Sequence, residues 1–268
     1  MGVSRWASCA STTSGLPPRH RLGGPGLRRL STRQAPPPFF ETLEHWYLAG
    51  ATTLGRRTAE LHRALASGTE PAFAPEPLDR AALGLLGEGM RAHADESLDL
   101  LARRLDTLTE ASRALAEVVL SRRKALLWRF DEVRSVDDAG VRMRIHGDYH
   151  LGQVLRTEED FVILDFEGEP ARSIAERRAK QSAIADVAGM LRSCSYAAYA
   201  ALFAFTVHAP NDYPLLEPWA DTWQHWASDA FLKGYRAVAH APLLPGDDGA
   251  WHALLSAFVL DKAFHELM

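Results

Sequence analysis

Apolar residues recur at helical spacing along much of the chain. Leu54, Leu61 and Leu65 fall on one face of a helix, and Thr58 and His62 belong to the same stripe. Arginines and a glutamate occupy the opposite face of this segment. This division of apolar and charged positions is typical of an amphipathic helix that packs against a core.

Two further helices are expected over residues 79–105 and 109–133. Each begins at a residue, Asp79 or Thr109, whose side-chain oxygen can cap a helix. The helical pattern returns at Ile174 and continues to the end of the chain, with breaks at proline-rich and glycine-rich loops.

Between the helical stretches, the pattern changes to that of short strands. Val141, Met143 and Ile145 alternate with arginines, and residues 161–164 form a short apolar run. The sequence therefore predicts a mainly α fold (α+β) in which one small β-hairpin interrupts two long helical regions.

Composition narrows the class of protein. Apolar residues make up 47% of the chain and charged residues 24%, which is typical of a globular domain and excludes wholesale disorder. The two cysteines, Cys9 and Cys194, have neither zinc-ligand nor disulfide spacing, which favours a reducing cytoplasm. The longest uncharged stretch, residues 193–211, contains several polar residues and predicts a buried helix, so no membrane span is expected.

Residues 1–38 differ from the rest of the chain. They are rich in Ser, Thr, Pro, Gly and Arg, contain no acidic residue, and are expected to be a disordered leader before one domain over residues 39–268. An organelle transit peptide or a stretch foreign to the native protein would have the same composition. Without the leader's six arginines, 24 basic and 34 acidic residues remain, a net charge of −10 that argues against nucleic-acid binding.

The segment from Ile145 to Glu167 carries the most specific chemistry. Asp148, Gln153 and Asp165 supply an acid, an amide and a second acid along a loop and the strands that follow it. Phosphoryl transfer needs a carboxylate that orients or deprotonates the attacking hydroxyl, and oxygen ligands that hold Mg²⁺ against the phosphates. The spacing matches the kinase scheme, with glutamine where the amide ligand is usually asparagine.

This segment resembles the catalytic core of the aminoglycoside phosphotransferase-like kinases. The run DFEGEPARSIAERRAKQSAIADVAGMLRS (residues 165–193) is similar to the maltokinases, which phosphorylate maltose with ATP to give maltose 1-phosphate. LGRRTAELHRALAS (residues 54–67) and FVLDKAFHELM (residues 258–268) are similar to the same family. The resemblance therefore covers residues 39–268.

The resemblance implies a fold, an activity and a set of roles. The fold is the helical carboxy-terminal lobe of a protein-kinase-like fold, with a small β-hairpin at the catalytic loop. ATP and Mg²⁺ are the implied cofactors, maltose the substrate, and trehalose synthase an associated protein in α-glucan, glycogen and trehalose metabolism. Asp148 would be the catalytic aspartate facing the anomeric hydroxyl, and Gln153 and Asp165 would bind Mg²⁺ and, through it, the nucleotide.

Other residues near this loop have supporting or substrate roles by the same reasoning. His146 is expected to be structural, with its ring bonded to backbone near Asp165, and Asp186 to brace the loop through backbone amides. The candidate substrate contacts are His150, Glu167, Glu169, Arg178 and Lys180. The alternative is that the two glutamates form solvated ion pairs with Arg177, Arg178 and Lys180.

One part of a kinase is not recognisable in the sequence. The phosphates need a glycine-rich loop and a strand lysine, but the first lysine of the chain is Lys124 and no glycine cluster follows a strand. We therefore expect that the amino-terminal lobe is missing, that the chain is a truncated form, and that it turns over slowly or not at all.

Three other interpretations stay open. An aminoglycoside- or choline-type phosphotransferase would use the same loop, although residues 168–180 favour a maltokinase. A metallohydrolase could use His146, Asp148 and His150 as ligands, but no second ligand cluster follows. The third interpretation is a non-catalytic remnant or interaction domain.

Overall fold

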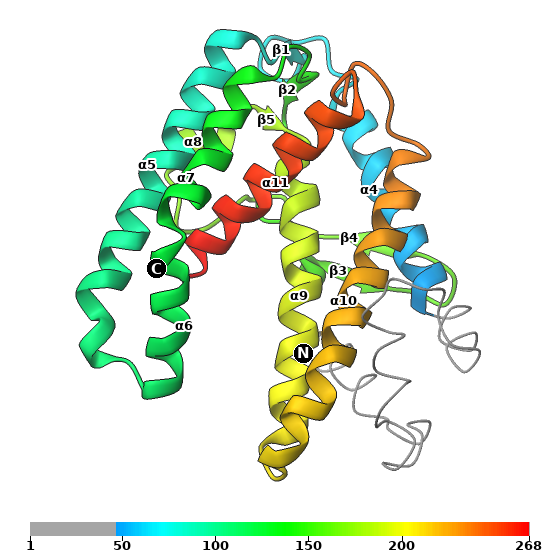
Figure 1. Cartoon of the computed structure of the whole chain (residues 1–268). Coiled ribbons are helices and arrows are strands. Elements are labelled where there is room, and N and C mark those ends of the chain that lie inside the picture. Colours follow the sequence, from blue (N-terminus) through cyan, green and yellow to red (C-terminus); the bar gives the residue numbers. More distant parts are fainter. Residues whose placement is uncertain (1–46, 268) are drawn as a thin grey trace. The chain divides into compact units, whose positions relative to one another are not determined.

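The computed structural model describes residues 47–267 (Figure 1). The helices are α4 (Ala49–Leu65), α5 (Arg80–Arg104), α6 (Glu110–Ser121), α7 (Arg123–Glu132), α8 (Ile174–Arg178), α9 (Ile184–Thr206), α10 (Tyr213–Arg236) and α11 (Asp248–His265). The strands are β1 (Glu76–Pro77), β2 (Val141–Met143), β3 (Val154–Arg156), β4 (Phe161–Ile163) and β5 (Gln181–Ser182). The predicted mainly α fold is therefore confirmed, whereas the leader lies outside the described residues.

The helices begin where their capping residues predict. The Asp79 carboxylate accepts a hydrogen bond from the amide of Ala82 at the start of α5, and the Thr109 hydroxyl accepts one from Ser112 at the start of α6. The single helix expected over residues 109–133 is two helices, because the backbone leaves helical geometry at Arg122. No helix in the described range is both long and apolar enough to cross a membrane.

The strands are shorter and paired differently from the expected single hairpin. β3 and β4 form an antiparallel hairpin with Val154 opposite Ile163. β2 instead pairs with β1 and β5, which come from distant parts of the chain, in a three-stranded antiparallel sheet. Local alternation identified β2 as a strand but contained no information about these partners.

The described residues form two compact units. The first comprises residues 47–61, 149–166 and 190–239, and the second comprises residues 62–148, 167–189 and 240–267.

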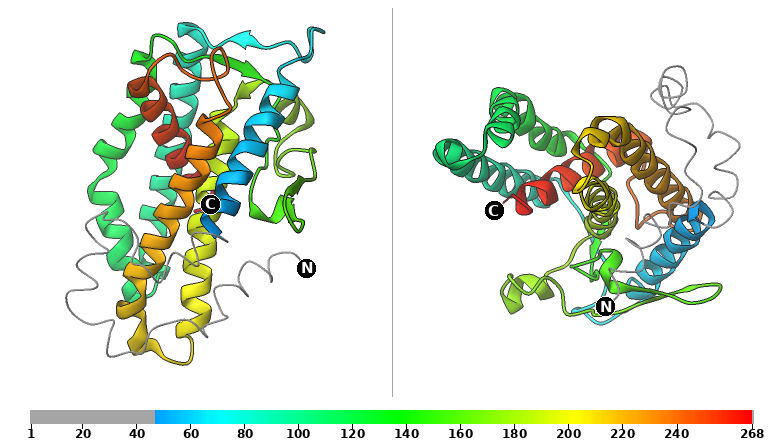
Figure 2. Two further views of the ribbon diagram at one scale, coloured as in Figure 1. Left: turned by 90° about the vertical axis from the view of Figure 1, so that its right-hand side faces the viewer. Right: turned by 90° about the horizontal axis from the view of Figure 1, so that it is seen from below.

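In the first unit, α4 lies beside α10 in both ribbon views (Figures 1 and 2). Two glycines permit a backbone-to-backbone approach: a Cβ on Gly55 would lie 2.0 Å from the carbonyl oxygen of Phe231, and one on Gly234 would lie 2.0 Å from that of Thr52. Any larger side chain at either position would force the helices apart. The contact fixes α4, whose buried face carries polar residues of the site.

In the second unit, α5, α7 and α11 pack around a common apolar core. Leu83, Leu98, Phe130 and Leu254 are each at most 1% exposed. Burial of such side chains supplies most of the favourable free energy of folding. The same unit contains β2, which leads directly into the loop that carries Asp148.

Candidate functional site

The loop after β2 is held by a buried carboxylate. The backbone amides of His146 and Gly147 donate to the two carboxylate oxygens of Asp186, at 2.8 Å and 2.9 Å. Asp186 is 2% exposed, and its Oδ2 is also 3.1 Å from Nε2 of the fully buried His62. A carboxylate with three such partners is satisfied, so it acts as a fixed anchor for the loop.

Asp148 follows this anchored turn directly. Gly147 has a left-handed backbone (φ +84°), which an L side chain rarely adopts, and the turn carries the chain into Asp148. The amide of Asp148 lies 3.4 Å from Nδ1 of His146, so the imidazole ring contacts the backbone of the loop that carries Asp148. His146 is 1% exposed, and its expected structural role stays a prediction.

The hairpin of the first unit brings Gln153 and Asp165 together. η7 (Leu151–Gln153) runs into β3, and the amide of Leu164, just after β4, donates to the carbonyl of Gln153 at 2.9 Å. The side chains then meet across the hairpin, where Nε2 of Gln153 donates to Oδ2 of Asp165 at 2.9 Å. Gln153 and Asp165, twelve residues apart in the sequence, are thus in direct contact.

Asp165 has a strained backbone. With φ +64° it is the sole non-glycine residue with a left-handed backbone between residues 47 and 267. Such a conformation costs on the order of 1–3 kcal/mol and is concentrated at functional sites. The side chain is exposed, so its carboxylate oxygens can be reached by a ligand.

The Gln153–Asp165 pair fits a hard cation. Mg²⁺ takes oxygen ligands and keeps several of its waters. Because the amide nitrogen of Gln153 donates to Asp165, its oxygen Oε1 is left as a cation ligand beside the carboxylate. Asp148 belongs to the other compact unit, and its expected role as the catalytic aspartate stays a prediction.

His150 shapes the turn that presents Gln153. Its Nδ1 accepts a hydrogen bond from the amide of Gly152 at 3.0 Å, and its carbonyl accepts one from the amide of Gln153, also at 3.0 Å. His150 therefore caps η7. A contact with substrate, expected from the sequence, stays a prediction.

Glu169 has different ion-pair partners from those that the sequence suggested. Its carboxylate lies 3.0 Å from Nε of Arg172 and 3.5 Å from Nζ of Lys262 on α11. Burial by itself would raise the pKa of Glu169, but Lys262 and Arg172 outweigh burial and hold that pKa below its usual value. The carboxylate is therefore ionised at neutral pH.

The other candidate substrate residues lie on or near α8. Lys180 is bound by the carboxylate of Glu76 and the carbonyl of Pro71, so contact with a sugar would require it to leave these partners. Arg178 and Glu167 are exposed, and the carbonyl of Arg178 accepts a hydrogen bond from Arg144.

Sequence reasoning missed some of the polar residues that hold the loops. Thr58 and His62 lie on the buried stripe of α4, where they looked like ordinary core positions. Both are fully buried, and the Thr58 hydroxyl is 2.8 Å from the hydroxyl of Tyr149, whereas His62 contacts Asp186. Two polar residues four positions apart on an apolar stripe are the signal that could have identified them.

The sequence suggested Arg177 only as a solvated ion-pair partner of the two glutamates. Its Nε is buried and has no hydrogen-bond partner among the residues that the structure describes. The side chain packs against the left-handed turn at Gly168, where a Cβ would lie 3.3 Å from Cγ of Arg177. Buried N–H groups nearly always donate to an acceptor, so a buried N–H without one is a rare feature.

Comparison with known proteins finds relatives among the glucosamine kinases. No family model matches the chain. A glucosamine kinase of Streptacidiphilus jiangxiensis is 31% identical over 195 residues, covering 71% of this chain and 38% of that protein. A glucosamine kinase of Mycolicibacterium smegmatis is 31% identical over 156 residues, covering 56% of this chain and 33% of that protein. The chain thus spans well under half the length of the curated relatives that it matches.

Solved structures agree with this comparison. Crystal form B of a glucosamine kinase superposes with a TM-score of 0.64 at 25% identity, covering 90% of this chain and 51% of that one. A glucosamine kinase in complex with glucosamine, ADP and inorganic phosphate has the same TM-score at 24% identity, covering 90% and 53%. The chain therefore has a kinase-like fold, shared with part of the glucosamine kinases.

Proposed function

We propose that this protein transfers a phosphoryl group from ATP to a hydroxyl of a small sugar. The observation that carries the proposal is the Gln153–Asp165 pair, joined at 2.9 Å and placed five and seventeen residues after Asp148. The two glucosamine kinase relatives support the same reaction class. Because the chain covers only 38% and 33% of these relatives, the share of the reaction that we propose for it is binding of the acceptor and of the metal ion.

Each residue of the catalytic segment has a distinct role in this proposal. Asp148 accepts or orients the proton of the attacking hydroxyl, and Gln153 and Asp165 hold Mg²⁺. When bound, this ion neutralises the charge that develops on the transferred phosphoryl group. Asp186 and His62 act through the loop backbone and are positioning residues.

Glucosamine is the acceptor that we favour. Both relatives are glucosamine kinases, and the part of the chain after residue 38 carries a net charge of −10. At neutral pH a large fraction of glucosamine carries an ammonium group, which a negatively charged protein attracts more strongly than a neutral sugar. The protein would act in the cytoplasm, where ATP is abundant.

Maltose is the second candidate. Its support is the similarity of residues 165–193 to the maltokinases. Phosphorylation of maltose would connect the protein with α-glucan metabolism and with trehalose synthase as an associated protein. An aminoglycoside acceptor would share the catalytic loop and the positive charge of glucosamine.

Coupled measurement of ADP release tests the reaction and its acceptor together. The purified protein is assayed with Mg·ATP and glucosamine, maltose, glucose or an aminoglycoside in parallel. We expect glucosamine to give the highest kcat/KM. Preference for maltose would assign the second candidate, and failure of every sugar to stimulate ADP release would contradict the proposal.

Asp148→Asn is the decisive variant. It should lower kcat by at least about a hundredfold, since the transition state loses a positioned base, while the fold is unchanged. Asp137→Asn is the matched control, because Asp137 is 87% exposed and pairs only at the surface with Arg80. Equal turnover by both variants would remove Asp148 from its role.

A further inference from the structure

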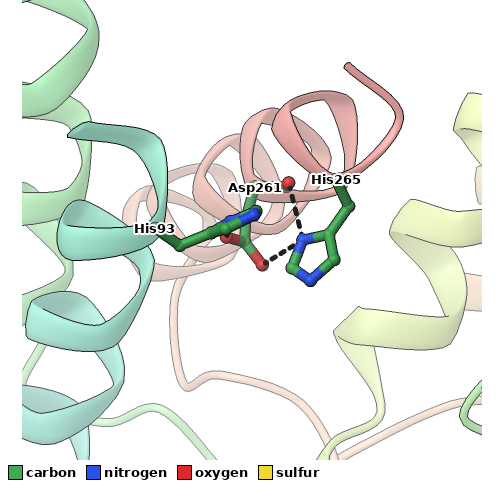
Figure 3. Close-up of side chains that lie close together, drawn as sticks. All are labelled: His93, Asp261 and His265. Carbon is green, nitrogen blue, oxygen red and sulfur yellow. Dashed lines mark hydrogen bonds and ion pairs between the residues drawn. The ribbon is translucent and has the colours of Figure 1, made fainter. Parts of the chain in front are cut away.

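A second cluster of metal-binding side chains lies on helices of the second unit. His93 on α5 faces Asp261 and His265 on α11 (Figure 3). Asp261 and His265 are four residues apart and therefore share one face of α11. None of these residues belongs to the phosphotransfer segment described above.

The three side chains already contact one another. Nδ1 of His93 is 3.0 Å from Oδ1 of Asp261, and Nδ1 of His265 is 3.9 Å from Oδ2 of the same carboxylate. The two imidazole rings have centroids 3.8 Å apart and planes 48° apart. The contacts join residues 168 positions apart in the sequence.

The donor atoms are spaced closely enough to surround one ion. One ring nitrogen from each histidine and one oxygen of Asp261 lie within 4.8 Å of one another. Zinc bonds of about 2.0–2.2 Å place neighbouring donors about 3–3.5 Å apart, so small side-chain rotations suffice. The side chains of His93, Asp261 and His265 are 22%, 17% and 31% exposed, which leaves an ion a path of entry.

We propose that His93, Asp261 and His265 bind one divalent transition-metal ion, with Zn²⁺ as the preferred ion, and that it fastens α11 to α5. Two imidazoles and one carboxylate form a ligand set that suits Zn²⁺, Co²⁺ or Ni²⁺ far better than Mg²⁺. A water molecule completes the coordination. This site is independent of the Mg²⁺ bound by Gln153 and Asp165 in the proposed phosphotransfer.

The charges around the cluster are balanced. Arg172 approaches His265, with 3.4 Å between Nη2 of the guanidinium group and Nε2 of the imidazole ring. Glu169 pairs with Arg172 and also with Lys262, the residue next to Asp261. One carboxylate therefore offsets part of the positive charge of both cations, which lowers their repulsion toward a metal ion.

The chain offers a matched control on α10. Asp221 and His225 have the same four-residue spacing, and their side chains form an ion pair at 3.4 Å. Both are more than half exposed, and within residues 47–267 no third metal-binding side chain joins them. The Asp221–His225 pair therefore serves as a control for metal binding by an Asp and a His on one helix without a histidine from a second helix.

Metal binding is measured on the chelator-treated 268-residue chain without nucleotide or sugar. Calorimetric titration with Zn²⁺ should show one high-affinity site, and Co²⁺ should give the intense visible bands of a tetrahedral site. His93→Gln and Asp261→Asn should each weaken binding by at least about a hundredfold, since even residues that only support ligands contribute about 10–100-fold. His225→Asn should leave the affinity unchanged.

A second measurement does not depend on the folding of any variant. In the unmodified chain, one equivalent of Zn²⁺ should shift the NMR signals of the His93 and His265 rings and leave those of His225 in place. Shifts at other histidines alone, or Zn²⁺ affinity that survives His93→Gln, would overturn the proposal. Asp165→Asn should not change Zn²⁺ affinity, which separates this test from that of the phosphotransfer.

Discussion

Asp186 and Asp165 are carboxylates of the same chemical type in two different settings. Asp186 is 2% exposed and engages two backbone amides and His62. Asp165 is exposed, has a left-handed backbone, and receives one hydrogen bond, from Gln153, among residues 47–267. The protein occupies most of the acceptor capacity of the Asp186 carboxylate, whereas the Asp165 carboxylate has more oxygen lone pairs left for a ligand.

The comparison shows how the environment of a carboxylate determines its role: Asp186 stabilises a loop, whereas Asp165 can bind a ligand. A buried carboxylate with several partners contributes to the structure, and removal of one member of such a network destabilises the fold. An exposed carboxylate on a strained backbone contributes little to folding and can be kept for chemistry. Substitution of Asp186 should therefore lower the stability of the fold, whereas substitution of Asp165 should lower activity with little effect on stability.

The largest effect on stability is expected from Asp186→Ala. It leaves the amides of His146 and Gly147 and the ring of His62 without their buried acceptor. Removing one partner of such a buried network costs about 3–5 kcal/mol of the free energy of unfolding, which urea denaturation would measure. In contrast, Asp137→Ala removes an exposed carboxylate and should change stability by less than about 0.5 kcal/mol. A loss below about 1 kcal/mol for Asp186→Ala would break the comparison.

Asp165→Asn should show the reverse behaviour. Asparagine tolerates a left-handed backbone, so the free energy of unfolding should change by less than about 1 kcal/mol. Phosphotransfer should fall by about a hundredfold or more, with a raised Mg²⁺ requirement, because the cation loses an anionic ligand. Asp160→Asn in the same hairpin region removes a carboxylate that pairs with Arg57 and should leave kcat nearly unchanged.

The packing of α4 against α10 gives a prediction about shape alone. Gly55→Ala inserts a methyl group where a Cβ would lie 2.0 Å from a backbone oxygen, and overpacking of this kind costs about 1–3 kcal/mol. Gly84→Ala on α5 meets nothing within 4 Å and should stabilise the helix by about 0.5–1 kcal/mol. Thermal unfolding of the two variants should therefore shift Tm in opposite directions, and a shift in the same direction would contradict the close approach.

The smallest effect is the pH dependence from Glu169. Since its pKa is lower in the folded protein than in the unfolded chain, its contribution is present above the unfolded pKa and is lost as the pH falls through the folded pKa. Unfolding free energy measured between pH 7 and pH 3 should thus fall less steeply for Glu169→Gln than for the unmodified chain. We expect the difference to be below about 1 kcal/mol, because the carboxylate is partly exposed. Identical pH profiles would show that Lys262 and Arg172 do not stabilise the ionised form of Glu169.

Local pattern predicted the elements better than their partners. The caps at Asp79 and Thr109 mark real helix starts, since a cap is a contact within one turn of the chain. Val141 and Met143 were identified as strand residues, yet their strand pairs with β1 and β5 and not with the apolar run at residues 161–163. Strand pairing depends on which segments meet in space, and a three-residue strand contains too little information to specify that.

The sequence by itself determined the helical class of the fold and predicted phosphotransfer chemistry for the segment from Asp148 to Asp165, because both depend on local spacing and residue type. Only the tertiary structure decided which charges pair. Glu169 contacts Lys262, and His93 contacts Asp261 across 168 residues of sequence. Each acidic residue could pair with many basic or histidine side chains of the same chemical type. The packing of the helices determines which of these side chains lies close enough and is buried enough to form the pair.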